Sequence, residues 1–301
     1  MRFVTRPRFL FGRVGLGWLL LGALLAACSD ERAGEASQQQ ASPEPIRLAY
    51  VPWDSEIAST HLVKAVIVQR LGQPVELLSV PLSALWASVA AGDVDASVAA
   101  WLPTLQRKQR QKHGDELQIL GPHLTGTRIG LAVPEYVPID GIGELSKHRA
   151  KFDGKIIGID PEAGIMQQTE AVMKTYGLTD FQLVSGSDST MTQVLERAIE
   201  ERRWVVVTAW TPHWKFAKWD LKYLSDPRGE FGKTERIHTL ARQGLAEQHP
   251  RVHAFLERFS WDVADMEELM LLIEQPDVSP EEAARIWMER HRDQVDQWLG
   301  E

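Results

Sequence analysis

The chain repeats one pattern: a short apolar run, a break, and a longer segment whose apolar residues recur at helical spacing. The run 46–51 favours a β-strand, and the segment after it favours a helix that Asp54 or Ser55 caps and Gly72 ends. The same reasoning predicts further strands at 75–80, 93–101, 129–133, 155–159, 181–184, 205–208 and 237–241. It predicts helices at 82–91, 106–114, 165–176 and 187–200, and several more within 249–301. Alternation of this kind indicates parallel sheets.

A folded body of roughly 255 residues exceeds the commonest size of a single core and suits two lobes. We expect the chain to cross from the first lobe near Pro134 and to return through the strand at 237–241. Residues 46–135 are then the first part of lobe 1, 136–237 are lobe 2, and 238–301 return to lobe 1 with the C-terminal helices. The predicted fold is a two-lobed α/β protein with a ligand cleft between lobes joined by two crossings.

The first 45 residues read as a leader and a tether. Four arginines precede an apolar run at 14–25 that is too short to be a permanent membrane helix, which is typical of a signal peptide over residues 1–27. Leu25-Ala-Ala-Cys28 resembles the bacterial lipobox, which predicts lipidation of Cys28, the only cysteine. A plain secretory signal with an incidental cysteine is the alternative. Residues 28–45 are polar and predict a flexible tether.

The charge of the chain argues against nucleic acid as a partner. Removal of the signal peptide takes four of the 33 basic residues and none of the 41 acidic ones, which leaves a net charge of −12. An acidic protein without basic clusters is a poor ligand for nucleic acid or anionic membrane surfaces. The sequence also lacks a Gly-x-Ser-x-Gly elbow, a metal-spaced histidine pair and a catalytic cysteine, so we expect no enzyme, metal or cofactor.

Three tryptophans stand at the ends of predicted strands. Trp210 follows the β-branched run 205–208, Trp53 follows the strand 46–51, and Trp101 ends the strand 93–101. In open α/β sheets the carboxyl ends of the strands form the edge where ligands bind. One such tryptophan alone would be read as core packing, but three at strand ends favour an aromatic cage. Aromatic ring faces attract cations that cannot donate hydrogen bonds, such as a quaternary ammonium.

The turn at 160–164 predicts a complementary anion site. It joins a strand to a helix, so the backbone N–H groups of Gly164 and Ile165 should be free at the helix start, where they favour a carboxylate. A single glycine in a turn is a weak signal by itself. Together with the cage it describes a cleft for a zwitterion such as a betaine.

Five stretches carry a resemblance to a known family: 48–60, 100–103, 157–166, 211–214 and 222–227. They resemble the glycine betaine/proline betaine substrate-binding proteins of bacterial ABC importers over nearly the whole mature body. The resemblance implies a hinge-closing, type II periplasmic-binding-protein fold that delivers its ligand to an ABC permease. It implies a cation cage of Trp53, Trp101 and Trp210, with the Gly164 and Ile165 N–H groups on the carboxylate. We expect a monomer in the periplasm or at the cell surface, anchored by lipid.

The sequence departs from the family pattern at one position. The family pattern after Trp-Leu-Pro ends in Thr-His, whereas this chain has Thr104-Leu105-Gln106. Gln106 can donate a neutral hydrogen bond to a carboxylate but carries no charge. His213 either contacts the ligand or, as we favour, fixes the turn between Trp210 and Trp214.

Ligand and partner stay open at this point. Carnitine, choline, proline betaine or a sulfonium zwitterion are alternatives to glycine betaine. A ligand-binding sensory module for a receptor is the second hypothesis. An enzyme that uses His213 with Asp160 or Asp54 is a distant third.

Overall fold

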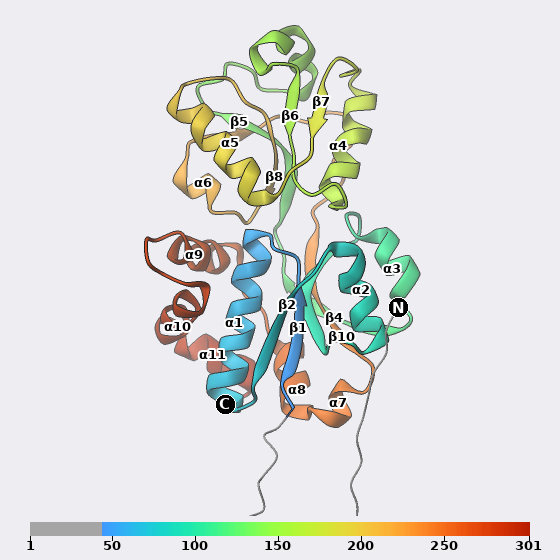
Figure 1. Ribbon diagram of the computed structural model, residues 1–301, viewed down its shortest axis with the longest axis vertical. Helices are drawn as coiled ribbons and strands as arrows, with labels where there is room; N and C mark the ends of the chain where they lie inside the picture. Colours follow the sequence, from blue (N-terminus) through green and yellow to red (C-terminus); the bar gives the residue numbers. More distant parts are fainter. Residues whose placement is uncertain (1–43) are drawn as a thin grey trace, which may run out of the picture. The chain divides into compact units, whose positions relative to one another are not determined.

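The computed structural model describes residues 44–301; the expected signal peptide, Cys28 and most of the expected tether lie outside the described residues. The described part contains two five-stranded sheets (Figure 1). No helix within 44–301 is long and apolar enough to span a membrane. We use "first lobe" for the sheet that contains the first strand and its helices, and "second lobe" for the other sheet and its helices.

The sheet of the first lobe has the strand order β2-β1-β3-β10-β4. Its strands are β1 (Ile46–Tyr50), β2 (Val75–Ser79), β3 (Ala96–Leu102), β4 (Leu117–Leu124) and β10 (Arg236–Arg242). Its helices are α1 (Asp54–Leu71), α2 (Leu82–Ala91), α3 (Arg107–His113), α7 (Leu245–Gln248), α8 (Pro250–Arg258), α9 (Val263–Ile273), α10 (Pro280–Arg290) and α11 (Arg292–Leu299). All seven residues of β3 are buried, so the strand that carries Trp101 runs through the core.

The sheet of the second lobe has the order β7-β6-β8-β5-β9. Its strands are β5 (Arg128–Pro134), β6 (Lys155–Ile157), β7 (Gln182–Val184), β8 (Val207–Thr211) and β9 (Leu221–Tyr223). Its helices are the 3₁₀ helix η1 (Ile142–Phe152), α4 (Gly164–Thr175), α5 (Asp188–Glu200) and α6 (Lys215–Lys218).

Both sheets are mixed, whereas the strand–helix alternation predicted parallel sheets. β1, β2 and β3 are parallel, but β10 pairs antiparallel with β3 and β4. In the second sheet β5 runs antiparallel to both β8 and β9. The antiparallel strands β5 and β10 each follow directly after a crossing between the sheets, so no helix precedes them to reverse the chain.

The first crossing also lies earlier than predicted. The strand expected at 129–133 in the first lobe is β5 of the second lobe, because its backbone pairs with β8 from Arg128 to Ala132. The chain therefore crosses at 125–127 and not near Pro134, and it returns between β9 and β10. The segment 222–227, one of the five stretches that carry the resemblance, contributes its first two residues to β9. The strand β4 was not predicted, since Gly121 and Pro122 interrupt its apolar pattern.

Local signals in the sequence mark the ends of several helices. Gly72 ends α1 and Gly92 ends α2 in the left-handed conformation, with φ of 69° and 78°. Ser279 caps α10, where its hydroxyl accepts a hydrogen bond from the Glu282 N–H, and Pro280 occupies the first helical position. Trp287 is fully buried and stacks on Trp298 at a ring distance of 5.8 Å, which is a packing role.

Candidate ligand-binding site

The three strand-end tryptophans lie where backbone structure fixes them. Trp53 follows β1 and directly precedes α1, whereas Trp101 and Trp210 are each one residue before the last residue of β3 and β8. Trp210 was expected just past its strand, but β8 starts two residues later than predicted and extends to Thr211 through pairing with Arg128 of β5. The three side chains are at most 6% exposed.

All three tryptophans line one cavity of about 360 Å³, including the part that opens to solvent. Trp53 and Trp101 come from the first lobe, and Trp210 comes from the second. The other lining residues are Leu105, Gln106, Ile129, Ile159, Ala163, Gly164 and Ile165. The structure therefore brings the three tryptophans, Gln106, Gly164 and Ile165 together around one cavity. His213 does not line it.

The cavity is bounded on one side by the start of α4. Ala163 is extended, with φ −61° and ψ 137°, and Gly164 is the first helical residue. Among the described residues the N–H groups of Gly164 and Ile165 have no hydrogen-bond acceptor. They carry the positive end of the helix dipole, which favours a negatively charged group. Gly164 also packs against the first lobe: a Cβ at this position would lie 2.3 Å from the Leu105 carbonyl oxygen.

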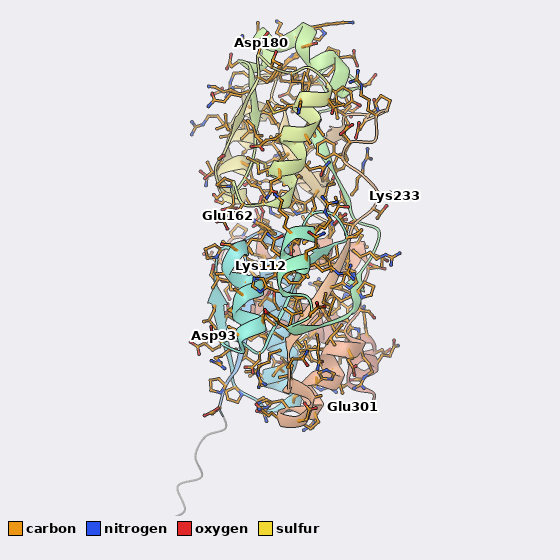
Figure 2. The ribbon with its side chains drawn as sticks, turned by 90° about the vertical axis from the view of Figure 1, so that its right-hand side faces the viewer. Asp93, Lys112, Glu162, Asp180, Lys233 and Glu301 are labelled. Carbon is orange, nitrogen blue, oxygen red and sulfur yellow. The ribbon has the colours of Figure 1, made fainter. Side chains whose placement is uncertain are left out.

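Several hydrogen bonds between the lobes surround the cavity. Glu162, labelled in Figure 2, accepts from the Ser83 N–H at 3.3 Å. The Trp53 indole N–H donates to Asp160 Oδ2 at 3.0 Å, and the Lys108 ammonium donates to Gln167 at 2.7 Å. The lobes thus meet around the cavity through contacts that sequence patterns do not encode.

Gln106 is held by the first lobe. Its side-chain oxygen accepts a hydrogen bond from the Trp86 indole N–H at 2.7 Å, and its amide nitrogen donates to the Ala99 carbonyl oxygen at 2.8 Å. One amide hydrogen is left for a ligand. The residue is 1% exposed, so its amide has a fixed orientation at the cavity wall.

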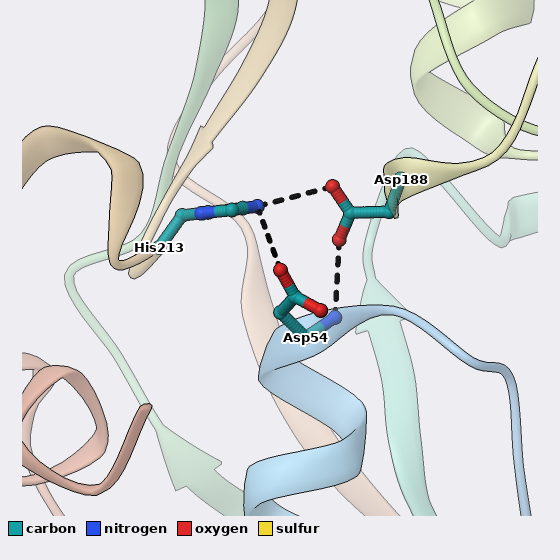
Figure 3. Close-up of side chains that lie close together, drawn as sticks. All are labelled: Asp54, Asp188 and His213. Carbon is teal, nitrogen blue, oxygen red and sulfur yellow. Dashed lines mark hydrogen bonds and ion pairs between the residues drawn. The ribbon is translucent and has the colours of Figure 1, made fainter. Parts of the chain in front are cut away.

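His213 lies behind Trp210 and does not line the cavity. Its Nε2–H donates to Asp188 Oδ1 at 3.1 Å (Figure 3). Its Nδ1 accepts the Lys215 backbone N–H at 3.2 Å. Burial, and then the nearby Lys215 ammonium, lower the pKa of the imidazole to about 4, so it is neutral. Its ring is 4.8 Å from that of Trp210. This geometry suits the turn-fixing role and gives no base at the cavity for the enzyme alternative.

Asp54 joins the same cluster from the first lobe. Its backbone N–H donates to Asp188 Oδ2 at 3.0 Å (Figure 3). Its carboxylate accepts from the Trp214 indole N–H. Asp54, Asp188 and His213 each offer a ligand atom, and these atoms lie within 4.8 Å of one another. Carboxylates and imidazoles at this spacing could in principle hold a metal ion. The Asp188 and His213 atoms are already hydrogen-bonded to each other. The amine of Lys215, whose pKa burial lowers to about 7, lies close enough to interact with both Asp188 and Asp54.

Two carboxylates behind the cage were not among the predicted ligand-binding residues, and Asp160 was considered only as a partner of His213 in the enzyme alternative. Glu56 on α1 accepts the Trp101 indole N–H at 2.6 Å, and Asp160 accepts that of Trp53. Glu56 is fully buried, and burial raises the pKa of its carboxyl to about 8. An acidic residue in the first turn of a helix is ordinary helix-start chemistry, so Glu56 carried no signal in the sequence.

A protein-family comparison matches residues 44–290 to the family OpuAC, the substrate binding domain of ABC-type glycine betaine transport systems. The chain is 45% identical over 145 residues to the glycine betaine/carnitine transport binding protein of Listeria monocytogenes serotype 1/2a (strain 10403S), and this region covers 48% of each protein. The chain thus spans about half the length of this curated relative.

Solved structures match over more of the chain. Lactococcal OpuAC, closed around glycine betaine, is 38% identical with a TM-score of 0.80, and covers 85% of this chain and 99% of that one. The glycine betaine/L-proline binding protein ProX of Borrelia burgdorferi is 33% identical with a TM-score of 0.80, over 85% and 96%. The chain therefore belongs to the family of substrate-binding proteins of ABC-type glycine betaine transport systems, which are transport proteins of the type II periplasmic-binding-protein fold and not enzymes.

Proposed function

We propose that this protein captures glycine betaine, or a related quaternary ammonium solute, outside the cytoplasm and delivers it to an ABC permease. The observation that carries the proposal is the convergence of Trp53, Trp101 and Trp210 from two lobes on one cavity. A trimethylammonium group fills an apolar aromatic box with its methyls while its charge meets the ring faces. Each ring contributes on the order of 0.5–2 kcal/mol, depending on how completely water is excluded.

The opposite wall supplies the site for a carboxylate. The Gly164 and Ile165 N–H groups are unengaged within the described residues and lie at the start of a twelve-residue helix. Hydrogen bonds from such groups to a carboxylate contribute about 1.5–3 kcal/mol each. The remaining amide hydrogen of Gln106 is the third donor at this end. A cation end and an anion end in one cavity favour a betaine over choline, which has no carboxylate.

Because the walls come from both lobes, the ligand is enclosed only when the lobes are closed, as in hinge-closing binding proteins. The names of the relatives support the ligand class: glycine betaine for lactococcal OpuAC, and glycine betaine or carnitine for the Listeria protein. We also propose a lipid anchor at Cys28, which would keep the protein at a membrane close to its permease.

Intrinsic tryptophan fluorescence tests the function directly. The purified protein is titrated with glycine betaine, proline betaine, carnitine, choline and a sulfonium betaine, with L-proline and glycine as ligands without a trimethylammonium group. Saturable binding of at least one quaternary ammonium or sulfonium compound, and none of glycine, is the expected result. A protein that binds none of these cations does not have the proposed function.

A further inference from the structure

Two of the three cage indoles donate their N–H to a carboxylate. Trp101 donates to Glu56 at 2.6 Å within the first lobe, and Trp53 donates to Asp160 at 3.0 Å between the lobes. The third ring has the opposite neighbour: the buried ammonium of Lys215 lies 4.1 Å from the centre of a Trp210 ring. The cage is therefore backed by carboxyl groups behind two of its rings and by the amine of Lys215 behind the third.

An anion at the indole N–H changes what the ring face offers to a ligand. Hydrogen bonds to an ionised acceptor are roughly twice as strong as those to a neutral one, so they fix the ring more firmly. The acceptor also pushes electron density into the ring and places negative charge beside the cation site. Burial strengthens this effect, because little water is present to screen it.

The burial of Glu56 does not stabilise the folded protein. Its Oε1 accepts from Trp101 and lies 3.4 Å from the Ser55 hydroxyl, but its Oε2 is buried without a partner among the described residues. An unsatisfied buried carboxyl oxygen destabilises a fold. Within residues 44–301 no basic side chain pairs with Glu56 either: Lys64, further along α1, is hydrogen-bonded to Glu281 of α10.

We propose that Glu56 and Asp160 are positioning residues that set the preference of the cage for a cation. Through the indole N–H groups of Trp101 and Trp53 they hold two rings in place and put negative charge next to the bound ammonium. This inference rests on the proposed function and adds the basis of its selectivity. Burial raises the pKa of Glu56 to about 8, so the empty site keeps it largely protonated at neutral pH. A bound cation stabilises its ionised form, and binding then releases a proton.

The test compares glycine betaine with 3,3-dimethylbutanoate, in which carbon replaces the nitrogen. The two molecules have the same shape and the same carboxylate, and only the first has a cation. Glu56→Gln keeps the size of the side chain and an acceptor for the Trp101 N–H but removes the charge. We expect this variant to weaken glycine betaine at least fivefold and to leave 3,3-dimethylbutanoate unchanged or bound more tightly. Asp160→Asn should act in the same direction.

Glu281→Gln is the matched control, because Glu281 lies on α10 and pairs with Lys64. Calorimetry in two buffers of different ionisation enthalpy adds a second readout: proton release on binding should occur in the parent and be absent in Glu56→Gln. Equal losses for both ligands, or no loss for either, would show that Glu56 acts only in packing and overturn the inference. If the parent itself binds no quaternary ammonium, the proposed function fails instead.

Discussion

Gly164→Ala isolates the contact between the lobes from the chemistry of the anion site. The added methyl carbon would lie 2.3 Å from the Leu105 carbonyl oxygen and 2.7 Å from the Leu105 carbonyl carbon, and real Cβ contacts are essentially never below 3.0 Å. Leu105 cannot easily yield, because its N–H and that of Thr104 are both bonded to Glu235 at 3.0 Å. The lobes must therefore stay about 0.7 Å or more further apart at this point.

The cost of that separation follows from the groups on the second lobe. Trp210 and the Gly164 N–H would both withdraw from a ligand held by the first lobe. Partial loss of one cation–π contact and of one charged hydrogen bond is on the order of 1–3 kcal/mol. The dissociation constant for glycine betaine should rise about 5- to 150-fold. Both N–H groups of the anion site remain, so the variant does not remove the chemistry itself.

Calorimetric titration of the parent and Gly164→Ala with glycine betaine measures the effect. Gly121→Ala in β4 is the matched control, because no atom lies within 4 Å of its added carbon. Thermal unfolding without ligand should be similar in all three proteins, since alanine is favourable in a helix. Affinity within twofold of the parent would falsify the reasoning that this contact limits closure.

Three further predictions concern other parts of the chain. Cys28→Ala should yield soluble or unprocessed protein on membrane fractionation, and a variant that still sediments with membranes would rule out the lipid anchor. Gln106→Leu should weaken glycine betaine more than choline and, because it leaves the buried Trp86 N–H unpaired, should cost about 1–3 kcal/mol of stability in urea unfolding; equal effects on both ligands would show that Gln106 does not face the anion. Burial raises the pKa of Glu56 from 4.5 to about 8, so the folded state keeps a proton that the unfolded state has lost, and stability falls as pH rises from 4.5 to 8, by up to about 1.4 kcal/mol per unit from this group. In Glu56→Gln, the free energy of unfolding measured with urea should fall less steeply between pH 5 and 8. An unchanged slope would contradict the raised pKa of Glu56.

The sequence placed the three tryptophans at strand ends because that signal is local. Trp53 and Trp101 each follow or end a buried apolar strand, and the strand that carries Trp210 is as clearly marked. The position of Gly164 was also readable, because it follows a strand and starts an amphipathic helix. Helix ends at Gly72 and elsewhere depend on the same short-range chemistry.

Contacts between distant segments were not readable in this way. The partner of Trp53 is Asp160, 107 residues away, and nothing near either residue indicates the other. The membership of β5 in the second sheet depends on pairing with β8, about 80 residues later, so periodicity alone placed it in the wrong lobe. Gln106 looked wholly available to a ligand, whereas its side-chain oxygen accepts from Trp86 and one of its amide hydrogens goes to Ala99, so a single amide hydrogen is left. Tertiary pairing decided each of these features.

The most direct test of the aromatic cage is calorimetric titration with glycine betaine of Trp53→Ala, Trp101→Ala and Trp210→Ala. Each substitution should cost on the order of 1–3 kcal/mol, through lost cation–π attraction and lost apolar contact, and replacement by phenylalanine should cost less. Trp287→Phe is the control, since Trp287 is buried against Trp298 on the C-terminal helices and does not line the cavity. All three cage variants should lose affinity for glycine betaine, and the control should not. Parent-like affinity in the three alanine variants would contradict the aromatic cage.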